Sequence, residues 1–565
     1  MPAAKSANGL VTRTDWQAVN WRRANRVVNN LRRRIFKAAQ AGDLKRVRSL
    51  QKLMLRSQSN TIISVRRVTQ VNAGKHTPGV DKLVVKTPAA RGHLVDHIES
   101  YQPWRALPVR RVYIPKNNGK QRPLGIPTVI DRCLQARVKN ALEPEWEARF
   151  EGCSYGFRPG RGCHDAIGKI YLLARPNMRQ KWVVDADIKG AFDNIDHDFL
   201  LRQVGQFPSR ALVRQWLKAG VLEDGVLHDT PAGTPQGGVI SPLLLNIALH
   251  GMEDALGVRY NKKGKNVGKR ALVRYADDFV VFCESQEDAV EVKDRALPTW
   301  LAERGLCLSA EKTRVVHLTE GFDFLGFNVR HYKAPETSRT GFKLLIRPSK
   351  KSVARKRKEL RDLWLGLRGH KVEAVLKKLN PVIRGWANYF RTVVSSKTFT
   401  DLDTWMFRRE LRYAKHTHPK KSWAWRRARY WGPLNKEHPR DNWTFGDKRT
   451  GRFLLKFKWH TIVRHPLVRA RASPDDPSLR DYWWERERVN ARHLCAADLR
   501  LAKSQTWCCP YCRMSLFNGE EIQRHHRRPR EQGGSDAPSN RELVHLFCHQ
   551  QRHRTRPERA PLLDS

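Results

Sequence analysis

Two apolar runs that meet at a pair of aspartates constrain the fold more than any other feature of this chain. The stretch LVRYADDFVVFC carries Asp277 and Asp278 at its centre, with apolar residues on both sides. Two such runs joined by a tight turn form a β-hairpin, and both carboxylates then lie at its exposed tip. Upstream, KWVVDADIKGAFDNID is a strand whose apolar run ends in Asp185 and Asp187. The sequence therefore predicts strands that carry bare carboxylates at their ends.

Carboxylates beside apolar strands are costly to bury unless a cation neutralises them. Two Mg²⁺ ions about 3.5–4 Å apart would do so and would support in-line phosphoryl transfer. One ion would activate a 3′-hydroxyl, and the other would steady the leaving pyrophosphate. The alternative is a strand that ends in acidic residues facing solvent, and a lone Asp-Asp turn would favour that alternative.

The order of the motifs favours the catalytic interpretation. Seven blocks follow one another between residues 110 and 329: RRVYIPKNNGKQRPLGIPT, SYGFRPGRGCHDAI, the Asp187 segment, GTPQGGVISPLLLNIALHGME, YADD, LSAEKTR and FDFLGFNV. In this order they resemble a reverse transcriptase, and their wording is most similar to the proteins encoded by group II introns. The resemblance implies an RNA-directed DNA polymerase.

That resemblance also implies roles for individual residues. Asp187, Asp277 and Asp278 would be the catalytic residues and would bind two Mg²⁺ ions. Asp185 is disfavoured as a ligand, because the metal-binding aspartate of the family opens the DIKGAF run. Phe192 matches the position of the family's steric gate, where a bulky ring excludes a ribose 2′-hydroxyl, so the product would be DNA.

The remaining nucleotide-binding residues follow from the same resemblance. Lys120 and Arg122 are placed to meet the triphosphate of a dNTP, the arginine through a bidentate contact. An ordinary loop lysine is the alternative for Lys120. Gln236, which precedes a glycine, would contact the nucleotide through its backbone. Lys312 matches a family lysine near the primer terminus.

The charge balance indicates a nucleic-acid partner. The chain has 107 Lys and Arg against 55 Asp and Glu, a net charge of +52, which attracts polyanions. Residues 345–435 are helical in pattern and very basic, and LNPVIRGWANYFR and HPKKSWAWRRARYW resemble the thumb and maturase region of the same family. The resemblance implies that the protein binds its own intron RNA and assists its splicing. Trp423, Trp425 and Trp431 are candidates for stacking on unpaired bases, although tryptophans at helical spacing are more often core residues.

A cluster of cysteines and histidines near the C-terminus resembles the HNH nuclease motif, a ββα-metal unit. Cys509 and Cys512 form a C-x-x-C pair, and His545 and Cys548 form an H-x-x-C pair beyond it. Four such ligands suit a tetrahedral structural Zn²⁺. Many relatives have a second cysteine pair where His545 stands, so Cys508 is the alternative fourth ligand.

The resemblance implies a catalytic set in the same segment. His526 would be the general base, and His525, His549 and His553 would bind one divalent metal. Asn540 would orient the base or brace the loop. His549 and His553 are four residues apart and therefore share one helix face, as a common metal requires. The alternative is a DNA-binding module that zinc holds together without cleavage.

The predicted fold is multidomain and α+β: a right-hand polymerase whose fingers and palm contain an antiparallel sheet, a helical thumb and a small ββα-metal HNH domain. The predicted domains are a basic helical N-terminal extension (1–72), fingers and palm (73–335), thumb and maturase (336–435), a DNA-binding region (436–488) and the HNH endonuclease (489–565).

No apolar run reaches the roughly 20 residues that span a bilayer, and we expect no membrane partner. Clustered rather than paired cysteines indicate a reducing compartment: the cytoplasm, in association with the nucleoid, or an organelle matrix. The expected partners are group II intron RNA in a ribonucleoprotein, double-stranded target DNA and dNTPs, and the oligomeric state stays open. The integrated hypothesis is intron mobility, in which the nuclease nicks target DNA and the polymerase copies the inserted intron from the nick. A reverse transcriptase of another retroelement, a splicing factor without polymerase activity and a stand-alone HNH nuclease are the competing hypotheses.

Overall fold

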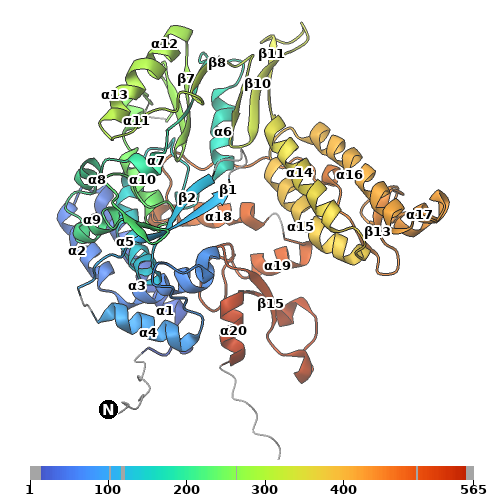
Figure 1. Cartoon of the computed structure of the whole chain (residues 1–565), viewed down its shortest axis with the longest axis horizontal. Coiled ribbons are helices and arrows are strands. Elements are labelled where there is room, and N and C mark those ends of the chain that lie inside the picture. The colour runs from blue at the N-terminus through green and yellow to red at the C-terminus, as the bar shows by residue number, and fades with distance from the viewer. Residues whose placement is uncertain (1–13, 101–102, 116–120, 262–263, 492–493, 555–565) are drawn as a thin grey trace, which may run out of the picture.

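The computed structural model describes residues 14–100, 103–115, 121–261, 264–491 and 494–554. In Figure 1 the N-terminal helices lie at the lower left, the palm strands above them, the thumb helices at the right, and the C-terminal segment below the centre. Strands and helices alternate through the first half of the chain and helices dominate the second half. The predicted multidomain α+β architecture is confirmed.

The N-terminal part is a bundle of helices. Val28, Leu31 and Ile35 lie on one face of the first helix at helical spacing and are buried in a common core. Asn20 and Asp43 cap the first two helices by accepting backbone N–H groups, so the ends are defined by local sequence. The helices are α1 (Trp21–Gln40), α2 (Leu44–Leu55), α3 (Gln58–Arg66), α4 (Pro88–Glu99) and α5 (Val129–Arg149).

The palm is built on a four-stranded antiparallel sheet. Its order is β6 (Ala271–Tyr275), β7 (Asp278–Cys283), β3 (Trp182–Asp187) and β8 (Arg314–His317). β6 and β7 form the predicted hairpin, because Tyr275 pairs with Asp278 across a two-residue turn. The helices of the palm are α6 (Cys163–Leu173), α7 (Ala191–Asn194), α8 (His197–Val204), α9 (Arg210–Leu217), α10 (Ser241–Ala248), α11 (Met252–Ala255), α12 (Gln286–Glu291) and α13 (Leu297–Ala302).

A second four-stranded sheet projects from the palm beside α5. Its order is β2 (Gln121–Ile126), β1 (Val109–Pro115), β4 (Val221–Glu223) and β5 (Val226–His228), with β1 and β4 parallel. The Gly125 N–H donates to the Gln236 carbonyl at 2.7 Å, which ties this sheet to the loop that precedes α10. This hydrogen bond joins the motif at 110–128 in the fingers to the motif at 233–253 in the palm.

The thumb follows a small three-stranded sheet. That sheet consists of β9 (Phe322–Phe324), β10 (Phe327–Lys333) and β11 (Phe342–Pro348). The helices are α14 (Lys350–Gly366), α15 (Val372–Phe390), α16 (Ser396–Thr417) and α17 (Trp423–Tyr430), and a short sheet contains β12 (Trp431–Gly432), β13 (Thr444–Asp447) and β14 (Arg452–Phe453). Trp431 is only 2% exposed and donates to Glu410, so it is a core residue, as the alternative stated for these tryptophans expects, and not a platform for bases. Trp423 and Trp425 are exposed.

The segment after the thumb crosses back to the palm. Asp165 on α6 is buried and accepts hydrogen bonds from the Val468 N–H at 2.9 Å and from the Arg486 guanidinium at 2.6 Å. His465 lies 3.0 Å from the same carboxylate. Arg486 belongs to α18 (Arg480–Asn490), which passes behind β1 in Figure 1. These contacts fix the path that leads to the C-terminal unit.

The C-terminal unit packs against the N-terminal helices. It contains α19 (Ala496–Ser504), β15 (Ile522–His526), β16 (Arg541–His545) and α20 (Leu546–Arg554). Trp21 and Val65 from the N-terminal helices share one apolar core with Trp507 and Val544. Arg66 is buried and donates to Glu520 at 2.7 Å. The N-terminal helices and the C-terminal unit are therefore adjacent in space (Figure 1).

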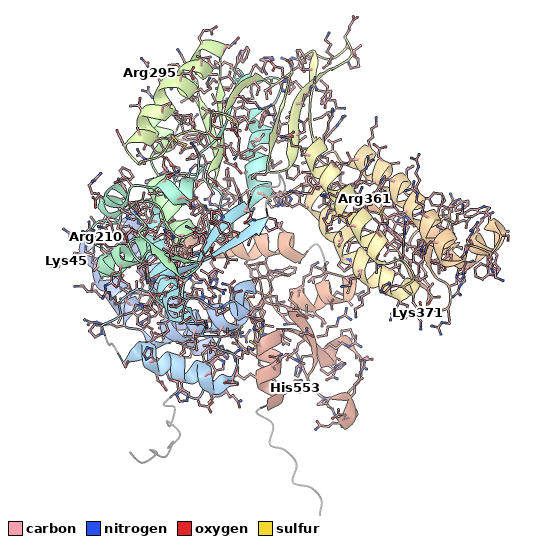
Figure 2. All side chains as sticks on the ribbon, in the orientation of Figure 1. Lys45, Arg210, Arg295, Arg361, Lys371 and His553 are labelled. Carbon is pink, nitrogen blue, oxygen red and sulfur yellow. The ribbon has the colours of Figure 1, made fainter. Side chains whose placement is uncertain are left out.

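Among the residues that the structure describes, no helix is both long enough and apolar enough to cross a membrane. Basic side chains lie on several separate parts of the molecule. Figure 2 labels Lys45, Arg210, Arg295, Arg361 and Lys371 on widely separated helices of the palm, thumb and N-terminal region. This distribution agrees with a large polyanionic partner.

Candidate functional site

Strand register gathers three aspartates at one end of the palm sheet. Asp187 is the last residue of β3 and pairs directly with Asp278, the first residue of β7. Asp277 occupies the turn between β6 and β7, beside Ala276 at φ 59°. A Cβ atom on Gly156 would lie 2.5 Å from the Ala276 nitrogen, so only glycine allows the loop at 154–157 to cover this turn.

The electrostatics of these carboxylates suit a divalent cation. Burial raises the pKa of Asp277, and loss of solvation together with the neighbouring Asp277 and Asp187 raises the pKa of Asp278 to about 7. The Lys312 ammonium lies 2.5 Å from the Asp187 carboxylate, a hydrogen bond that raises the pKa of Lys312. The carboxylates of Asp187 and Asp278 at the strand ends and of Asp277 in the turn supply oxygen ligands of the type that Mg²⁺ prefers. The residues therefore fit the expected metal.

Asp185 lies two residues before Asp187 and has a different partner. Burial raises its pKa to about 6 despite the Arg314 guanidinium, which donates to its carboxylate at 3.1 Å. Asp185 pairs with Val280 rather than with either turn aspartate. An arginine thus already neutralises this group, in agreement with its exclusion from the predicted ligand set.

The predicted nucleotide-binding residues lie on the elements around the aspartates. Phe192 on α7 contacts the ring of Phe157, with centroids 6.3 Å apart, and Phe157 also contacts Tyr275. Arg122 lies on β2, and its charge opposes the rise in the pKa of Asp277. Lys120 lies outside the described residues.

The loop that contains Gln236 requires a glycine at the next position, 237. Gly237 adopts φ +125°, and a Cβ atom there would lie 2.8 Å from the Gly125 carbonyl oxygen. The Gln236 side chain donates to Asp193 on α7 at 3.0 Å, and Asp193 directly follows Phe192. The loop therefore holds its backbone against both β2 and α7.

A first cluster in the C-terminal unit brings together two cysteine pairs separated in sequence. The ligand atoms of Cys509, Cys512, His545 and Cys548 lie within 4.8 Å of one another, and all four residues are buried. Cys512 Sγ is 3.3 Å from His545 Nδ1. This cluster could bind zinc. Cys508, the alternative fourth ligand, is not a member of it.

A second cluster consists of His525, His549 and His553, whose ring nitrogens also lie within 4.8 Å of one another. Burial and the neighbouring histidines lower the pKa of His525 to about 4. Its Nε2 atom is buried and has no hydrogen-bond partner among the described residues. A neutral imidazole with a free nitrogen is a metal ligand, so this set fits a divalent cation.

His526 and Asn540 lie on either side of the loop between β15 and β16. His526 Nε2 is 2.8 Å from the Asp536 carboxylate. The Asn540 amide donates to the carbonyls of Arg528 and Ser535, and its oxygen accepts from the Arg528 N–H, so Asn540 braces the loop. His526 is the next residue after His525 and pairs with Arg541, at the end of the β15–β16 ladder next to the connecting loop.

Three functional contacts were missed from the sequence. Asp536 beside His526, Phe157 beside Phe192, and Arg66 beside Cys548 at 3.5 Å were not predicted. Arg66 and Cys548 are separated by most of the chain, and no pattern of spacing indicates such a contact. Phe157 lies within the SYGFRPGRG motif and Asp536 lies in the loop between β15 and β16, but the partners of both residues depend on tertiary structure.

Comparison with protein families gives four matches in one order along the chain. They are the N-terminal domain of reverse transcriptase over residues 16–98, the reverse transcriptase (RNA-dependent DNA polymerase) over 114–329, the group II intron maturase-specific domain over 353–431 and the HNH endonuclease over 509–555.

Three curated relatives resemble parts of the chain. Protein YkfC of Escherichia coli (strain K12) is 34% identical over 340 residues, which cover 53% of this chain and 87% of that protein. The group II intron-encoded protein LtrA of Lactococcus lactis subsp. cremoris is 33% identical over 294 residues, 41% of this chain and 49% of that protein. The uncharacterized 91 kDa protein in a cob intron of Schizosaccharomyces pombe is 28% identical over 57% of this chain and 49% of that protein. The chain thus spans about half the length of the latter two.

Proposed function

Because the chain belongs to the reverse transcriptases encoded by group II introns, with polymerase, maturase-specific and HNH domains in order, we propose that it carries out intron mobility by target-primed reverse transcription. It binds its intron RNA, assists splicing, nicks target DNA and copies the inserted intron from the nick. It acts where that RNA is made, in the bacterial nucleoid or an organelle matrix. The predicted domain limits, 1–72, 73–335, 336–435, 436–488 and 489–565, form part of the proposal.

The observation that carries this proposal is the convergence of Asp187, Asp277 and Asp278 at one end of the palm sheet. Asp187 and Asp277 hold two Mg²⁺ ions, with Asp278 beside them. The ions supply charge neutralisation for phosphoryl transfer from a dNTP. Lys312 lies beside Asp187 and positions the primer end, while Arg122, Lys120 and the Gln236 backbone hold the nucleotide.

The nuclease site uses a separate set of residues. His526 acts as the general base that draws a proton from water, and Asp536, 2.8 Å away, orients its ring. His525, His549 and His553 hold one divalent metal, which stabilises charge on the phosphodiester. Cys509, Cys512, His545 and Cys548 hold a structural Zn²⁺ that stabilises this small unit. Double-stranded DNA is the substrate.

Primer extension by the purified protein tests the polymerase. A DNA primer annealed to an RNA template should be extended with dNTPs and Mg²⁺ and should be extended poorly with ribonucleotides. The same assay tests Phe192. In the Phe192→Val variant we expect the preference for a dNTP over the matching ribonucleotide, measured as a ratio of kcat/KM values, to fall by about ten- to a hundredfold.

The value of kcat/KM for the dNTP is the internal control, since a smaller side chain should remove a clash without removing a contact to the deoxyribose. An unchanged ratio would show that Phe192 is not the steric gate. If the parent protein failed to extend any primer, the polymerase proposal itself would be wrong.

An exposed basic face on the thumb is the proposed contact to intron RNA. Lys351, Arg355 and Lys358 lie at helical spacing on α14, and all three are exposed. Replacing the three by alanine should weaken binding of the intron RNA and slow protein-assisted splicing at near-physiological Mg²⁺ toward the rate of RNA alone. Each lost phosphate contact lowers the slope of log affinity against log salt by about 0.7–0.9.

Rates of splicing of a labelled precursor RNA, with and without protein, measure this effect. The control is a protein with Asp277→Ala, which should assist splicing as the parent does, because the RNA itself carries the splicing chemistry. Equal splicing rates with and without the parent protein would refute the maturase role.

A further inference from the structure

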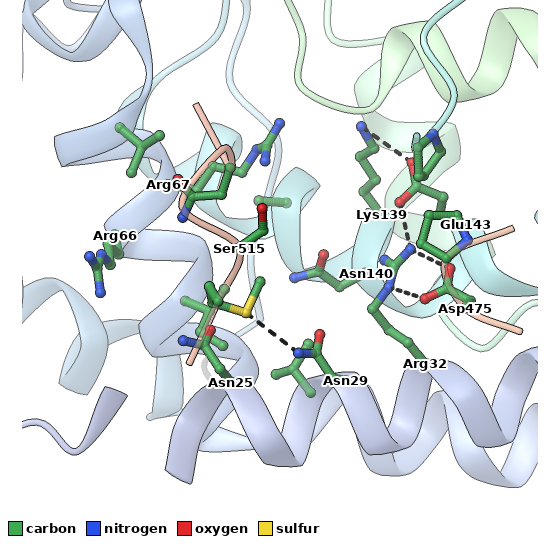
Figure 3. Close-up of a pocket in the computed structure, with 18 of the residues that line it drawn as sticks. Asn25, Asn29, Arg32, Arg66, Arg67, Lys139, Asn140, Glu143, Asp475 and Ser515 are labelled. Carbon is green, nitrogen blue, oxygen red and sulfur yellow. Dashed lines mark hydrogen bonds and ion pairs between the residues drawn. The ribbon is translucent and has the colours of Figure 1, made fainter. Parts of the chain in front are cut away.

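A cavity of about 660 Å³ lies where the N-terminal helices, the palm and the nuclease unit meet (Figure 3). Segments that are distant in sequence contribute to its wall: α1, the region of α3, α5, the loop at 157–159, the segment at 474–475, and the turn at 512–520 that follows Cys509. Most of the residues that line it are polar or charged, so the cavity is not a defect in an apolar core.

The acidic residues of the wall are already neutralised. Arg32 on α1 donates to Glu143 at 2.9 Å and to Asp475 at 2.7 Å, as the dashed lines in Figure 3 show. Arg66 likewise forms an ion pair with Glu520 at 2.7 Å. These pairs join the helices, the linking segment and the nuclease unit, and they leave no carboxylate of the wall without a cation.

Three further arginines give the cavity its positive charge. Arg33, Arg67 and Arg513 line it with exposed side chains, and none forms an ion pair in the part of the chain that the structure describes. Asn25 and Asn29 lie beside them on α1, and each amide donates a single hydrogen bond to the nuclease turn. Guanidinium groups that lack carboxylate partners, next to amides with spare hydrogen-bonding capacity, are suited to phosphates and bases.

The cavity reaches the polymerase site through Phe157. This residue lines the cavity and also contacts Phe192 and Tyr275, with ring centroids 6.3 and 6.5 Å away. Phe192 is the proposed gate for the incoming nucleotide, and Tyr275 directly precedes the turn that carries Asp277. A strand held in the cavity would therefore end at the place where an incoming nucleotide is selected.

We propose that this cavity binds the unpaired RNA template strand as it approaches the polymerase site, with Arg67 and Arg513 each contacting a phosphate. The inference rests on the proposed polymerase function. The strand that leads to the site of nucleotide selection is, by the chemistry of templated synthesis, the template that has not yet been copied and is therefore unpaired. The nuclease turn thus forms part of the polymerase's template path.

Binding of primer–template hybrids with different template overhangs tests the proposal. The probes are a DNA primer on an RNA template with a 5′ overhang of one nucleotide or of about ten, within the range of single-strand sites. The parent should bind the long overhang more tightly. The double variant, Arg67→Ala with Arg513→Ala, should lose most of that gain in affinity. For the long overhang, the slope of log affinity against log salt should fall by about 0.7 for each arginine removed. Binding of the short overhang should not change.

Arg295→Ala is the matched control, because Figure 2 shows Arg295 on the opposite end of the molecule from α1. Arg513→Lys and Arg67→Lys keep the charge and should keep the gain. An equal loss on both overhangs would attribute the effect to folding or duplex binding and overturn the proposal, as would an unchanged gain. A loss confined to hybrids with an unpaired DNA strand would assign the cavity to DNA instead. Because binding needs no catalysis, a failure of primer extension would be seen separately.

Discussion

Replacing Asp277 by alanine should abolish cDNA synthesis while leaving RNA binding intact. Asp277 lies in the turn of the β6–β7 hairpin, beside the pair formed by Asp187 and Asp278. A metal contributes several kcal/mol to stabilising the transition state, and each 1.36 kcal/mol corresponds to about a tenfold change in rate. Loss of one ligand should therefore reduce the rate of primer extension by about a thousandfold or more.

Primer extension on an annealed RNA template, beside filter binding of the same RNA, measures both parts of this expectation. Asp185→Asn is the matched control: Asp185 lies on the same strand as Asp187 but forms an ion pair with Arg314. That variant should retain activity within about tenfold of the parent, an effect close to 1.4 kcal/mol. Synthesis that survives Asp277→Ala would contradict the assignment of the polymerase site.

Replacing His526 by alanine should eliminate nicking of target DNA. A positioned general base contributes about 10²–10⁴-fold to a reaction, so a loss of that size is expected even when the metal remains bound. His526 contacts Asp536 at 2.8 Å and contributes to neither cluster of candidate metal ligands. Its removal should therefore leave metal content and folding unchanged.

Nicking of a labelled duplex by the ribonucleoprotein measures this effect. Primer extension by the His526→Ala variant should equal that of the parent, and Asp277→Ala should nick normally, because the two sites share no residue. Asp536→Asn should reduce nicking less than His526→Ala, since Asp536 only orients the ring. Nicking that persists in His526→Ala would show that another residue is the base.

The sequence was sufficient where function depends on local pattern. The two-residue turn after Tyr275 and the period of the apolar strands predict the hairpin, and the order of seven motifs predicts the polymerase. The pairing of Asp187 with Asp278 then follows from the antiparallel sheet. The spacing of His549 and His553 on one helix likewise predicts that they lie together, as the structure shows.

The sequence was insufficient where a side chain's surroundings depend on distant segments. Trp423, Trp425 and Trp431 look alike in a basic helical segment, yet only Trp431 is buried, because it packs against Phe445. Cys508 and His545 are both chemically suitable as the fourth ligand beside Cys509. Only the folded β15–β16 hairpin shows that His545 lies in the cluster and Cys508 does not. No local signal distinguishes such cases, since each depends on packing between elements far apart in the chain.

The shared core of the two chain ends bears on how such an enzyme can be shortened. Trp21 and Val65 are buried together with Trp507 and Val544. A chain cut before the nuclease unit would turn that face of the N-terminal helices toward water as a contiguous apolar patch, a surface that favours aggregation. A nuclease-free polymerase prepared from this protein for copying RNA would therefore need polar substitutions on α1 and α3 to stay monomeric.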